Sequence, residues 1–558
     1  MTTSQPTKFA ITIFSLLILL SAVATAQLKI GSGNTATADP PVPHPKTTPC
    51  TVVLFKGFIF NNFNAQSFPY TPPAACPGPW GAVVLTADFS ISAGIQYDRT
   101  ANIWLGPTNI YFGTTAEDQP NEGRNWHIER DLTDYSAILD SAEQGTVDLG
   151  NEVNQTYTGV IHGSASLQFY PPAPKQTAPR VPDQVIGFSA GSTGGTVGLG
   201  STSSLLEQTL TLPTNITSLF FDVFAQSQSG DEFWYTCVPN DVAAELESCS
   251  GTAFRESEVT IDGNPAGVAP VYPWIYTGGI DPFLWIPIPG VQTLNFKPYR
   301  VNLTPFASVL DDGQPHTIAL SVYNADNYFS ATAALLLYLD HGATQVTGAL
   351  TENTLAAPAP VYTENIHVGP TGNISGSVSA KSSHNFQISG YVNTSYGPVT
   401  TTVAQNIAFS SVETFNIKSA TYVQNINQAT NVHSVVTTKN SSGTHVNTVS
   451  RAWPMKMDIS LIFNPDGSAS QTTDVNQYFQ TTQQAKLNGQ PTTSALLQDR
   501  VISADTLLIN SAGQLAGNEN QASSQTYFGS NSTGYCYSEA IAGAANVLTS
   551  VSTGTGCN

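Results

Sequence analysis

The chain has 558 residues, of which 41% are hydrophobic and only 10% are charged. Its 39 acidic and 19 basic residues give a formal net charge of −20. This balance argues against nucleic-acid partners and anionic membrane surfaces, because both bind clustered Lys and Arg. A chain of this length is expected to form two to four domains, since one core rarely supports so many residues.

The N-terminus predicts an exported protein. Lys8 precedes an unbroken apolar run that closes on Ala-Thr-Ala at residues 24–26. A positive charge, a short apolar stretch and a small-residue exit are the parts of a secretory signal peptide, so we expect cleavage after Ala26. A membrane anchor is the alternative for this run. No later stretch approaches the roughly 20 apolar residues of a membrane-spanning helix, so we expect a secreted protein with no membrane association after cleavage.

Six cysteines fall into three local pairs, and no Cys-x-x-Cys spacing occurs. In an exported protein this pattern favours disulfides between sequence neighbours, although sequence order alone does not fix the connectivity. The expected pairs are Cys50 with Cys76, Cys237 with Cys249, and Cys536 with Cys557. Seven Asn-x-Ser/Thr sequons predict N-glycosylation, at Asn154, Asn215, Asn302, Asn373, Asn393, Asn440 and Asn531.

Short alternating runs of Val, Ile, Thr, Phe and Tyr, broken by Gly, Pro, Asn and Asp, recur along the chain. They predict β-strands with one buried face. The clearest runs lie at 83–94, 218–227, 256–267, 316–325 and 333–342. Only 131–140 resembles a helical turn, which Asp131 or Thr133 could cap.

Proline-rich segments divide these strands into domains. Residues 27–48 are a polar linker, residues 171–183 form a second joint, and the composition becomes rich in Ser, Thr, Asn and Gln after 355–362. We therefore expect an all-β protein. Its predicted parts are two β-sandwich (jelly-roll) domains side by side, at 49–172 and 184–345, and a C-terminal β-rich region at 346–558.

Several common catalytic patterns are excluded. Residues 187–191 match Gly-x-Ser-x-Gly, but the glycine-rich stretch that follows cannot form the helix that a nucleophilic serine elbow needs. The nine histidines lack a metal-binding spacing such as HExxH, and every cysteine has an expected partner. We therefore expect no metal and no cofactor, and by elimination carboxylates carry any hydrolytic chemistry.

Three acidic clusters are candidates for that chemistry, at 94–106, 126–135 and 229–236. In the first, Asp98 stands beside Arg99. In the third, Glu232 is followed by aromatic residues. Apolar surroundings raise the pKa of a carboxyl group, whereas a neighbouring arginine lowers it. The alternatives are an ordinary ion pair for Asp98 and a hairpin tip for the third cluster. For the second cluster, Glu129, Asp131 and Asp134 could simply cap a helical turn.

Taken in order, these segments resemble the peptide-N4-(N-acetyl-β-glucosaminyl)asparagine amidase A family. The matching blocks include GIQYDRTANIWLG, WHIERDLTDYSAIL, SGDEFWY, YPWIYTGGIDPFLW and ISGYVNTSYGPVTTTVAQNIAF, and they cover nearly the whole mature chain. The resemblance implies hydrolysis of the β-aspartylglucosaminyl amide of N-glycopeptides or glycoproteins. That reaction releases a glycosylamine and converts asparagine to aspartate.

The same resemblance implies roles for individual residues. A distantly related bacterial peptide:N-glycanase has two jelly-roll domains with the site in the cleft between them. It carries an aromatic-Asp-Arg tripeptide, which Tyr97-Asp98-Arg99 resembles, and a Glu-Phe dipeptide, which Glu232-Phe233 resembles. Asp98 would be the general base, Arg99 would keep it ionised, and Glu232 would position water or assist the leaving amine. The expected substrate contacts are Tyr97, Asp231, Trp234, Tyr235 and Glu152.

Two other functions fit parts of the pattern. A non-catalytic, lectin-like β-sandwich would need aromatic residues in a cleft but no convergent carboxylates. A glycoside hydrolase that cuts within the chitobiose core would leave one sugar on asparagine. The feature that favours the amidase over the lectin is the expected approach of Asp98 and Glu232 across the cleft between two domains.

Overall fold

The computed structural model describes residues 28–557, so the predicted signal peptide at 1–26 lies outside the described residues. Strands make up 56% of the structure and helices 5%. The prediction of an all-β protein is therefore confirmed. Within the described part of the chain, no helix combines the length and apolar character needed to cross a membrane.

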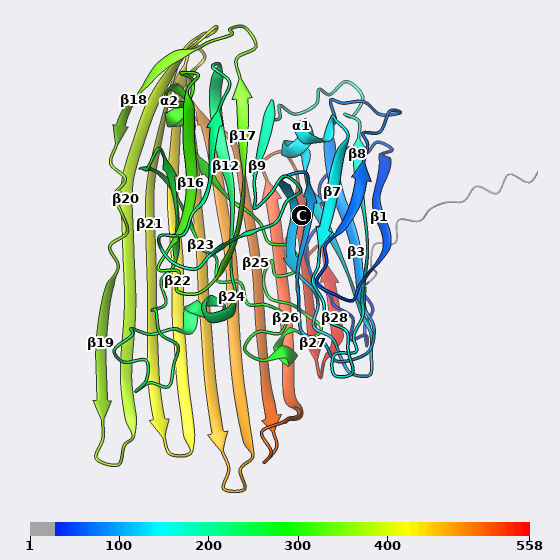
Figure 1. Cartoon of the computed structure of the whole chain (residues 1–558), viewed down its shortest axis with the longest axis vertical. Helices are drawn as coiled ribbons and strands as arrows, with labels where there is room; N and C mark the ends of the chain where they lie inside the picture. The colour runs from blue at the N-terminus through cyan, green and yellow to red at the C-terminus, as the bar shows by residue number, and fades with distance from the viewer. Residues whose placement is uncertain (1–27, 558) are drawn as a thin grey trace, which may run out of the picture.

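The first sandwich packs two four-stranded antiparallel sheets face to face (Figure 1). One sheet has the order β1-β8-β3-β6 and the other β2-β7-β4-β5. Its strands are β1 (Cys50–Phe60), β2 (Gln66–Tyr70), β3 (Ala82–Ile91), β4 (Thr100–Leu105), β5 (Thr108–Thr114), β6 (Arg124–Asp131), β7 (Glu143–Asp148) and β8 (Ile161–Tyr170). The finer assignment as a jelly roll stays a prediction, which this alternation of strands between the sheets favours.

The second sandwich also has two antiparallel sheets, ordered β10-β17-β12-β15 and β11-β16-β13-β14, with β9 added beside β17. Its strands are β9 (Gln184–Phe188), β10 (Val197–Leu199), β11 (Leu206–Thr211), β12 (Ile216–Ser227), β13 (Glu256–Ile261), β14 (Asn264–Pro270), β15 (Tyr299–Asn302), β16 (Pro315–Tyr323) and β17 (Phe329–Leu339). The single strand predicted at 256–267 is wrong. Asp262 and Gly263 both have positive φ angles there and turn the chain into a hairpin.

The C-terminal region is one antiparallel sheet of eleven strands, most of them very long (Figure 1). Both β18 and β19 pair with β20, and every later strand pairs with the next along the chain. The strands are β18 (Thr347–Asn353), β19 (Val361–Val368), β20 (Ile374–Thr394), β21 (Gly397–Lys418), β22 (Thr421–Asn440), β23 (Gly443–Phe463), β24 (Ala469–Leu487), β25 (Gln490–Ile509), β26 (Leu515–Asn531), β27 (Cys536–Ala544) and β28 (Val547–Thr553). This sheet forms the back of the molecule, behind the second sandwich in Figure 1.

The second sandwich and the C-terminal sheet share one hydrophobic core. Trp453 on β23 packs edge-on against Tyr272, with ring centroids 5.4 Å apart. Phe409 on β21 packs against Phe254, with ring centroids 5.1 Å apart. Alternate residues of the long strands are buried, as expected for a sheet that covers a sandwich with one face and meets solvent with the other.

The two sandwiches are also joined by a continuous core. Leu294, Ala334 and Leu336 of the second sandwich belong to the hydrophobic cluster of the first. The Tyr135 hydroxyl donates a hydrogen bond to Asp222 at 3.1 Å, and Arg300 forms ion pairs with Asp222 at 2.7 Å and with Asp134 at 2.6 Å. This interface fixes the orientation of the two sandwiches, on which a site between them depends.

The segment 28–48 runs along the C-terminal sheet before the first sandwich begins. The Gly31 N–H donates to the Leu548 carbonyl at 2.7 Å, and the Ala38 N–H donates to the Gln525 side chain at 2.7 Å. Ala38 is fully buried. The predicted domain boundaries stay predictions, although each group of strands above begins and ends near them.

The three predicted disulfides are confirmed, and the described residues contain no free cysteine. The helical turn at 131–140 is present as a short 3₁₀ turn (Thr133–Tyr135) followed by α1 (Ser136–Leu139). Asp131 caps it by accepting the Thr133 N–H at 2.9 Å. Glycosylation of the seven sequons stays a prediction; Asn154, Asn373, Asn393 and Asn531 are exposed.

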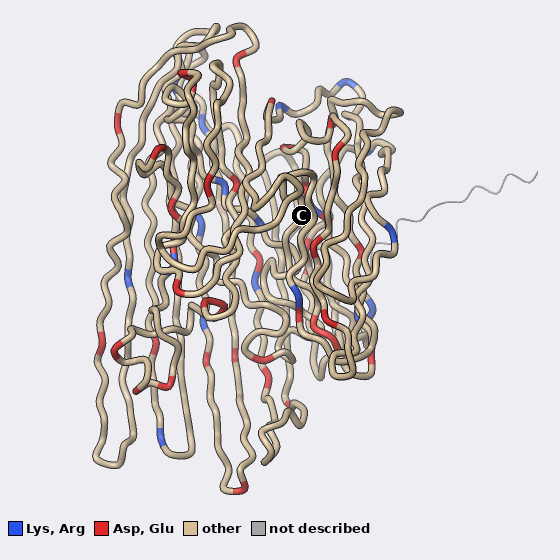
Figure 2. Tube along the Cα trace, viewed as in Figure 1, with Lys and Arg blue, Asp and Glu red and all other residues tan. Residues whose placement is uncertain are grey.

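Charged residues are sparse along the long strands (Figure 2). A few of these charged residues are buried acids. Glu413 on β21 is only 1% exposed, and its carboxyl accepts a hydrogen bond from Gln424 at 2.8 Å. Burial raises the pKa of Glu413 from 4.5 to about 8. The folded chain therefore holds a proton there that the unfolded chain has released, and stability falls as pH rises through this range.

We expect the free energy of unfolding, measured in urea, to be higher at about pH 5 than at about pH 8.5. Glu413→Gln should flatten this dependence, because glutamine keeps the neutral form at every pH. Asp474→Asn, at an exposed position of the same sheet, is the matched control and should leave the dependence unchanged. An equal slope in wild type and Glu413→Gln would contradict the prediction.

Candidate active site

A β-hairpin brings two carboxylates together at one end of the first sandwich. β4 and β5 pair with Thr100 opposite Thr114, so the residues just before β4 lie beside those just after β5. The Arg99 N–H donates to the Thr115 hydroxyl at 2.8 Å, and the Thr115 N–H donates to the Arg99 carbonyl at 2.8 Å. Asp98 and Glu117 extend from this paired end.

A loop of the second sandwich, residues 271–298, crosses to the same hairpin end. The Thr277 hydroxyl donates to the Thr115 carbonyl at 2.6 Å. The next residue, Gly278, lies against both carboxylates. A Cβ built there would be 2.6 Å from Asp98 Oδ1 and 3.1 Å from Glu117 Oε2. The backbone of this loop therefore forms one wall of the cluster, and only glycine leaves room for both acids.

The C-terminal sheet holds that loop from behind through glutamine side chains. Gln477 on β24 donates to the Pro273 carbonyl at 2.7 Å and accepts the Val291 N–H at 2.8 Å. Gln521 on β26 donates to the Ile286 carbonyl at 2.7 Å. These buried amides satisfy backbone groups that would otherwise be unpaired, so the loop has a fixed path.

Glu232 reaches the cluster from the second sandwich. It follows β12 in a turn between two short 3₁₀ segments, Ser229–Asp231 and Trp234–Thr236. Gln228, at the start of that turn, donates to the Thr100 hydroxyl at 2.9 Å, which anchors the turn to β4. The Phe233 ring, next to Glu232, lies against Gly279, where a built Cβ would be 3.3 Å from Phe233 Cε1, and Asp98 lies against the preceding Gly278. The charge of Asp98 contributes to the raised pKa of Glu232.

The protonation of these acids follows from their surroundings. Burial, and then the charge of Asp98, raise the pKa of Glu232 to about 7. Burial and the charges of Asp98 and Asp118 raise the pKa of Glu117 well above its usual value. Burial also raises the pKa of Asp98, but the Gly278 N–H and the Arg99 guanidinium lower it. Burial therefore shifts all three acids toward their protonated forms, and at Asp98 the Gly278 N–H and the Arg99 guanidinium oppose that shift.

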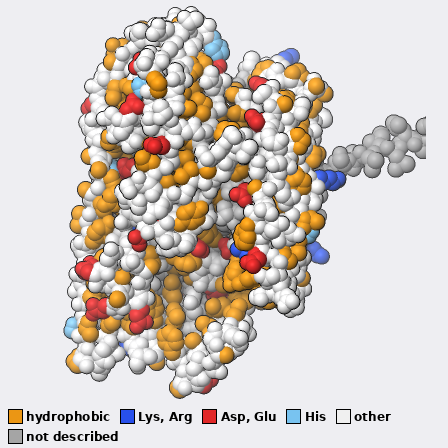
Figure 3. Space-filling view, viewed as in Figure 1, with side chains coloured by type: hydrophobic (Ala, Val, Ile, Leu, Met, Phe, Trp, Pro, Cys, Tyr) orange, Lys and Arg blue, Asp and Glu red, His pale blue; other side chains and the backbone are white. Residues whose placement is uncertain are grey.

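Two exposed aromatic rings lie beside Arg99. The guanidinium lies 5.7 Å from the Phe63 ring centroid and 5.8 Å from that of Tyr97. Tyr97 is 59% exposed and Phe63 is 64% exposed, and Tyr157 packs 5.3 Å from Tyr97. Such rings can stack on sugar faces. The space-filling view shows a hollow between the first sandwich and the rest of the molecule, with charged and hydrophobic side chains along it (Figure 3).

The structure places Glu152 beside this aromatic group, not among the acids. Its backbone carbonyl accepts a hydrogen bond from Gln96 at 2.8 Å, and Gln96 in turn accepts the Arg99 side chain at 2.6 Å. The Glu152 carboxylate is exposed and accepts a hydrogen bond from Asn154 at 3.0 Å. A contact between Glu152 and a bound glycan stays a prediction.

Three predicted substrate contacts are wrong, because the side chains are buried. Asp231 is fully buried, where it pairs with Arg255 at 2.8 Å and accepts three backbone N–H groups, from Asp326, Asn327 and Tyr328. Trp234 and Tyr235 are both fully buried in the core shared with the C-terminal sheet. All three support the turn that carries Glu232, and none can touch a glycan.

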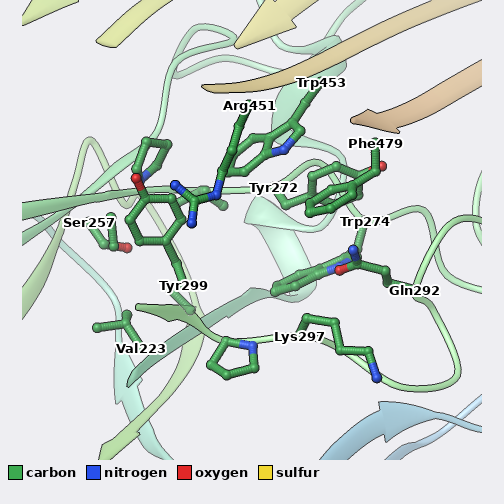
Figure 4. Close-up of a pocket in the computed structure, with 15 residues that line it drawn as sticks. Val223, Ser257, Tyr272, Trp274, Gln292, Lys297, Tyr299, Arg451, Trp453 and Phe479 are labelled. Carbon is green, nitrogen blue, oxygen red and sulfur yellow. The ribbon is translucent and has the colours of Figure 1, made fainter. Parts of the chain in front are cut away.

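A small pocket between the second sandwich and the C-terminal sheet is not this site. Tyr272, Trp274, Trp453 and Phe479 surround it, with Arg451 at one side (Figure 4). Its volume is about 60 Å³, which holds a few water molecules but no sugar ring. It contains none of the three acids.

Sequence reasoning missed Glu117, Gly278, Phe63 and Tyr157. Glu117 had a detectable signal, because a Glu-Asp pair directly follows the strand that pairs with the Asp98 strand. The other three come from loops whose position depends on tertiary packing. Ser189, by contrast, is correctly excluded as a nucleophile. Its hydroxyl donates to the Gly191 carbonyl in an exposed turn that no helix follows.

Glu117 is expected to act in its neutral form, because its pKa is raised well above the usual value. Glu117→Gln keeps the size and a hydrogen-bond donor, so it should retain most of the turnover on an N-glycopeptide at about pH 5. Glu117→Ala should lose about 10-fold, the kinetic equivalent of roughly one hydrogen bond. Glu122→Ala, nearby and exposed, should match wild type. Full activity of Glu117→Ala would show that the residue has no part in the site.

Known proteins resemble the chain over the same region. A family model described as Peptide N-acetyl-beta-D-glucosaminyl asparaginase amidase A matches residues 40–355. Peptide-N4-(N-acetyl-beta-glucosaminyl)asparagine amidase A of Prunus dulcis is 30% identical over 392 residues, which are 66% of this chain and 67% of that protein. The family match thus includes both sandwiches and ends shortly after β18.

Solved structures of low identity were also found. PNGase F, a glycosylasparaginase from Flavobacterium meningosepticum, is 13% identical with a TM-score of 0.34, and the match covers 52% of this chain and 96% of that chain. PNGF-II is 12% identical with a TM-score of 0.36, and the match covers 52% of this chain and 65% of that chain.

Proposed function

The chain belongs to the peptide N-acetyl-β-D-glucosaminyl asparaginase amidase A family, and from that premise we propose that it is a peptide:N-glycanase. Its substrate would be the amide that links N-acetylglucosamine to asparagine in N-glycopeptides or glycoproteins. The observation that carries the proposal is that Asp98 and Phe233, the residue after Glu232, lie against the adjacent glycines Gly278 and Gly279, so that acids of two different sandwiches border one loop. Burial raises the pKa of both Asp98 and Glu232.

The proposed reaction uses one carboxylate and one carboxylic acid. Asp98, ionised, takes a proton from a water molecule as that water attacks the amide carbon. Glu232, still protonated below about pH 7, gives its proton to the glycosylamine nitrogen as the carbon–nitrogen bond breaks. The products are a glycosylamine and a peptide aspartate, and the proton taken by Asp98 balances the one that Glu232 gives. The raised pKa of Glu232 keeps it protonated up to about pH 7, whereas the raised pKa of Asp98 means that its ionised fraction falls as the pH becomes more acidic.

Other groups would position the substrate. Arg99 follows Asp98 directly, donates to Gln96 and lies beside the exposed rings of Tyr97 and Phe63. It can donate hydrogen bonds to the amide oxygen as negative charge develops there, while the rings contact the first sugars. The Gly278 backbone would limit the space beside Asp98 and Glu117. Water would therefore approach the amide carbon from one side only.

Export is part of the proposal. Three disulfides in a chain whose N-terminus predicts a signal peptide support a secreted protein. A fusion of residues 1–26 to a reporter protein, expressed in plant cells, would test this. Retention of the reporter inside the cells would contradict export.

The deciding experiment follows a defined N-glycopeptide by mass spectrometry in H₂¹⁸O at about pH 5. The expected product is the deglycosylated peptide with aspartate carrying ¹⁸O in place of asparagine. A peptide that keeps one N-acetylglucosamine would mean glycosidase chemistry instead. An untouched glycopeptide that still binds to the protein would favour the lectin-like function.

A further inference from the structure

Three polar side chains meet between the second sandwich and the C-terminal sheet, away from the acid cluster described above. Glu256 and Glu258 are two residues apart on β13, so their side chains leave the same face of the strand. His384 on β20 faces them, with Nδ1 3.2 Å from Oε1 of Glu256. One ligand atom from each of the three lies within 4.8 Å of the others.

Their surroundings make this group unusual. Glu256 is 2% exposed and His384 is 7% exposed. Among the described residues, Oε1 of Glu256, Oε1 of Glu258 and both ring nitrogens of His384 are buried without a hydrogen-bond partner. Unpaired buried polar atoms are costly and rare in folded proteins. The two ring nitrogens of His384 point in different directions, so one of them can join a shared ligand together with one oxygen from each glutamate. Such a ligand would complete the bonding of these three atoms.

We infer that Glu256, Glu258 and His384 bind a divalent transition-metal ion of the Zn²⁺ type. Two carboxylates and one neutral imidazole match such an ion in charge and in ligand type, and a water molecule can take a fourth position. The three ligand atoms lie within 4.8 Å of one another, so small side-chain movements would bring them around a single ion, whose bonds are about 2.0–2.2 Å. No Lys or Arg among the described residues forms a salt bridge with either carboxylate.

The location assigns the ion a structural role. β13 belongs to the second sandwich and β20 to the C-terminal sheet, so one ion would connect the two through their buried faces. The spacing of histidines along the sequence did not predict this site, because His384 is remote from the two glutamates and meets them only when the sheet folds against the sandwich.

The competing explanation is a proton shared by the two carboxyls. Burial and the nearby Glu258 raise the pKa of Glu256 well above its usual value, so without an ion the pair would hold at least one proton. A shared proton accounts for the two glutamates, and the His384 ring would then interact only with Glu256, 3.2 Å from Nδ1, and with the Ala357 backbone. The two explanations differ in whether the folded protein retains a metal.

The test uses the full mature chain, incubated with excess Zn²⁺, desalted and analysed by inductively coupled plasma mass spectrometry. We expect about one Zn²⁺ per chain. A strong chelator should lower the thermal midpoint by about 5 °C, and added Zn²⁺ should restore it. His384→Gln should retain no Zn²⁺ and should melt at the same temperature with and without chelator. Zn²⁺ that stays on His384→Gln would be adventitious and would overturn the proposal.

His316→Gln is the matched control. His316 lies in the second sandwich, as Glu256 and Glu258 do, and pairs with Asp262 and Asp312 outside the cluster. Its replacement should therefore leave Zn²⁺ binding intact. If His384→Gln does not fold, Glu258→Gln serves for the same measurements. Wild-type protein that retains no Zn²⁺ and melts identically with and without chelator would overturn the proposal, whatever the variants do. None of these readouts depends on amidase activity.

Discussion

Replacement of Asp98 by asparagine is expected to lower the turnover of an N-glycopeptide by at least about 10²–10⁴-fold. Asparagine has nearly the same shape but cannot take a proton from water. Thermal stability should change little, because burial already disfavours the charged form of Asp98. Single-turnover rates at about pH 5, measured with the melting midpoint on the same preparation, separate the two effects.

The control for this variant is Asp88→Asn. Asp88 is an exposed acid of the first sandwich that pairs with His127 at 2.8 Å, so its replacement changes the same charge without touching the cluster. We expect wild-type turnover from it. If Asp98→Asn keeps wild-type activity, Asp98 is not the base, and the role would pass to another acid of the cluster.

Deletion of residues 346–558 is expected to prevent the two sandwiches from folding, although they contain all the proposed catalytic groups. The second sandwich has no complete core without the C-terminal sheet, because the two share one hydrophobic cluster. The deletion would expose Trp234, Tyr235 and the loop 271–298. Such an apolar surface leads to aggregation. Gel filtration of the truncated chain should show aggregates, and its near-ultraviolet circular dichroism should lack the signal of packed aromatic side chains.

Point variants refine this prediction. Trp453→Ala removes one large ring of the shared core and should destabilise the chain by about 3–5 kcal/mol. Tyr396→Ala, at a β-hairpin tip where the side chain is 76% exposed, should leave stability unchanged. A truncated chain that is monomeric and unfolds cooperatively would contradict the shared core and would make the sheet an independent domain.

Much of the fold could be predicted from local patterns. Runs rich in apolar and β-branched residues located β3, β12, β16 and β17. The expectation of one buried face is wrong for β17, whose two faces contact the cores of both sandwiches. The same patterns could not separate β13 from β14. The hairpin turn there needs only Asp262 and Gly263, and the alternation continues on both sides of them.

The site was predictable only in part, and the reason is tertiary. Asp98 and Glu232 were located from short motifs, and the structure brings them within electrostatic reach. The neighbours of Glu232 were misassigned, because a run of aromatics beside an acid resembles a sugar subsite. Trp234 and Tyr235 are buried by a sheet that begins more than a hundred residues later in the chain. The sequence around them does not indicate this burial.

The glutamines that hold the 271–298 loop affect how this protein can be recombined. Gln477 and Gln521 form hydrogen bonds with main-chain atoms of the loop. These bonds depend on the backbone conformation of the loop and not on its side chains. A relative with a different loop sequence but the same path could therefore accept this sheet. A relative whose loop differs by one residue in length could not, since the amides would meet the wrong carbonyls and Gly278 would shift from Asp98. In chimaeras of this fold, loop length should determine which C-terminal halves give active enzyme.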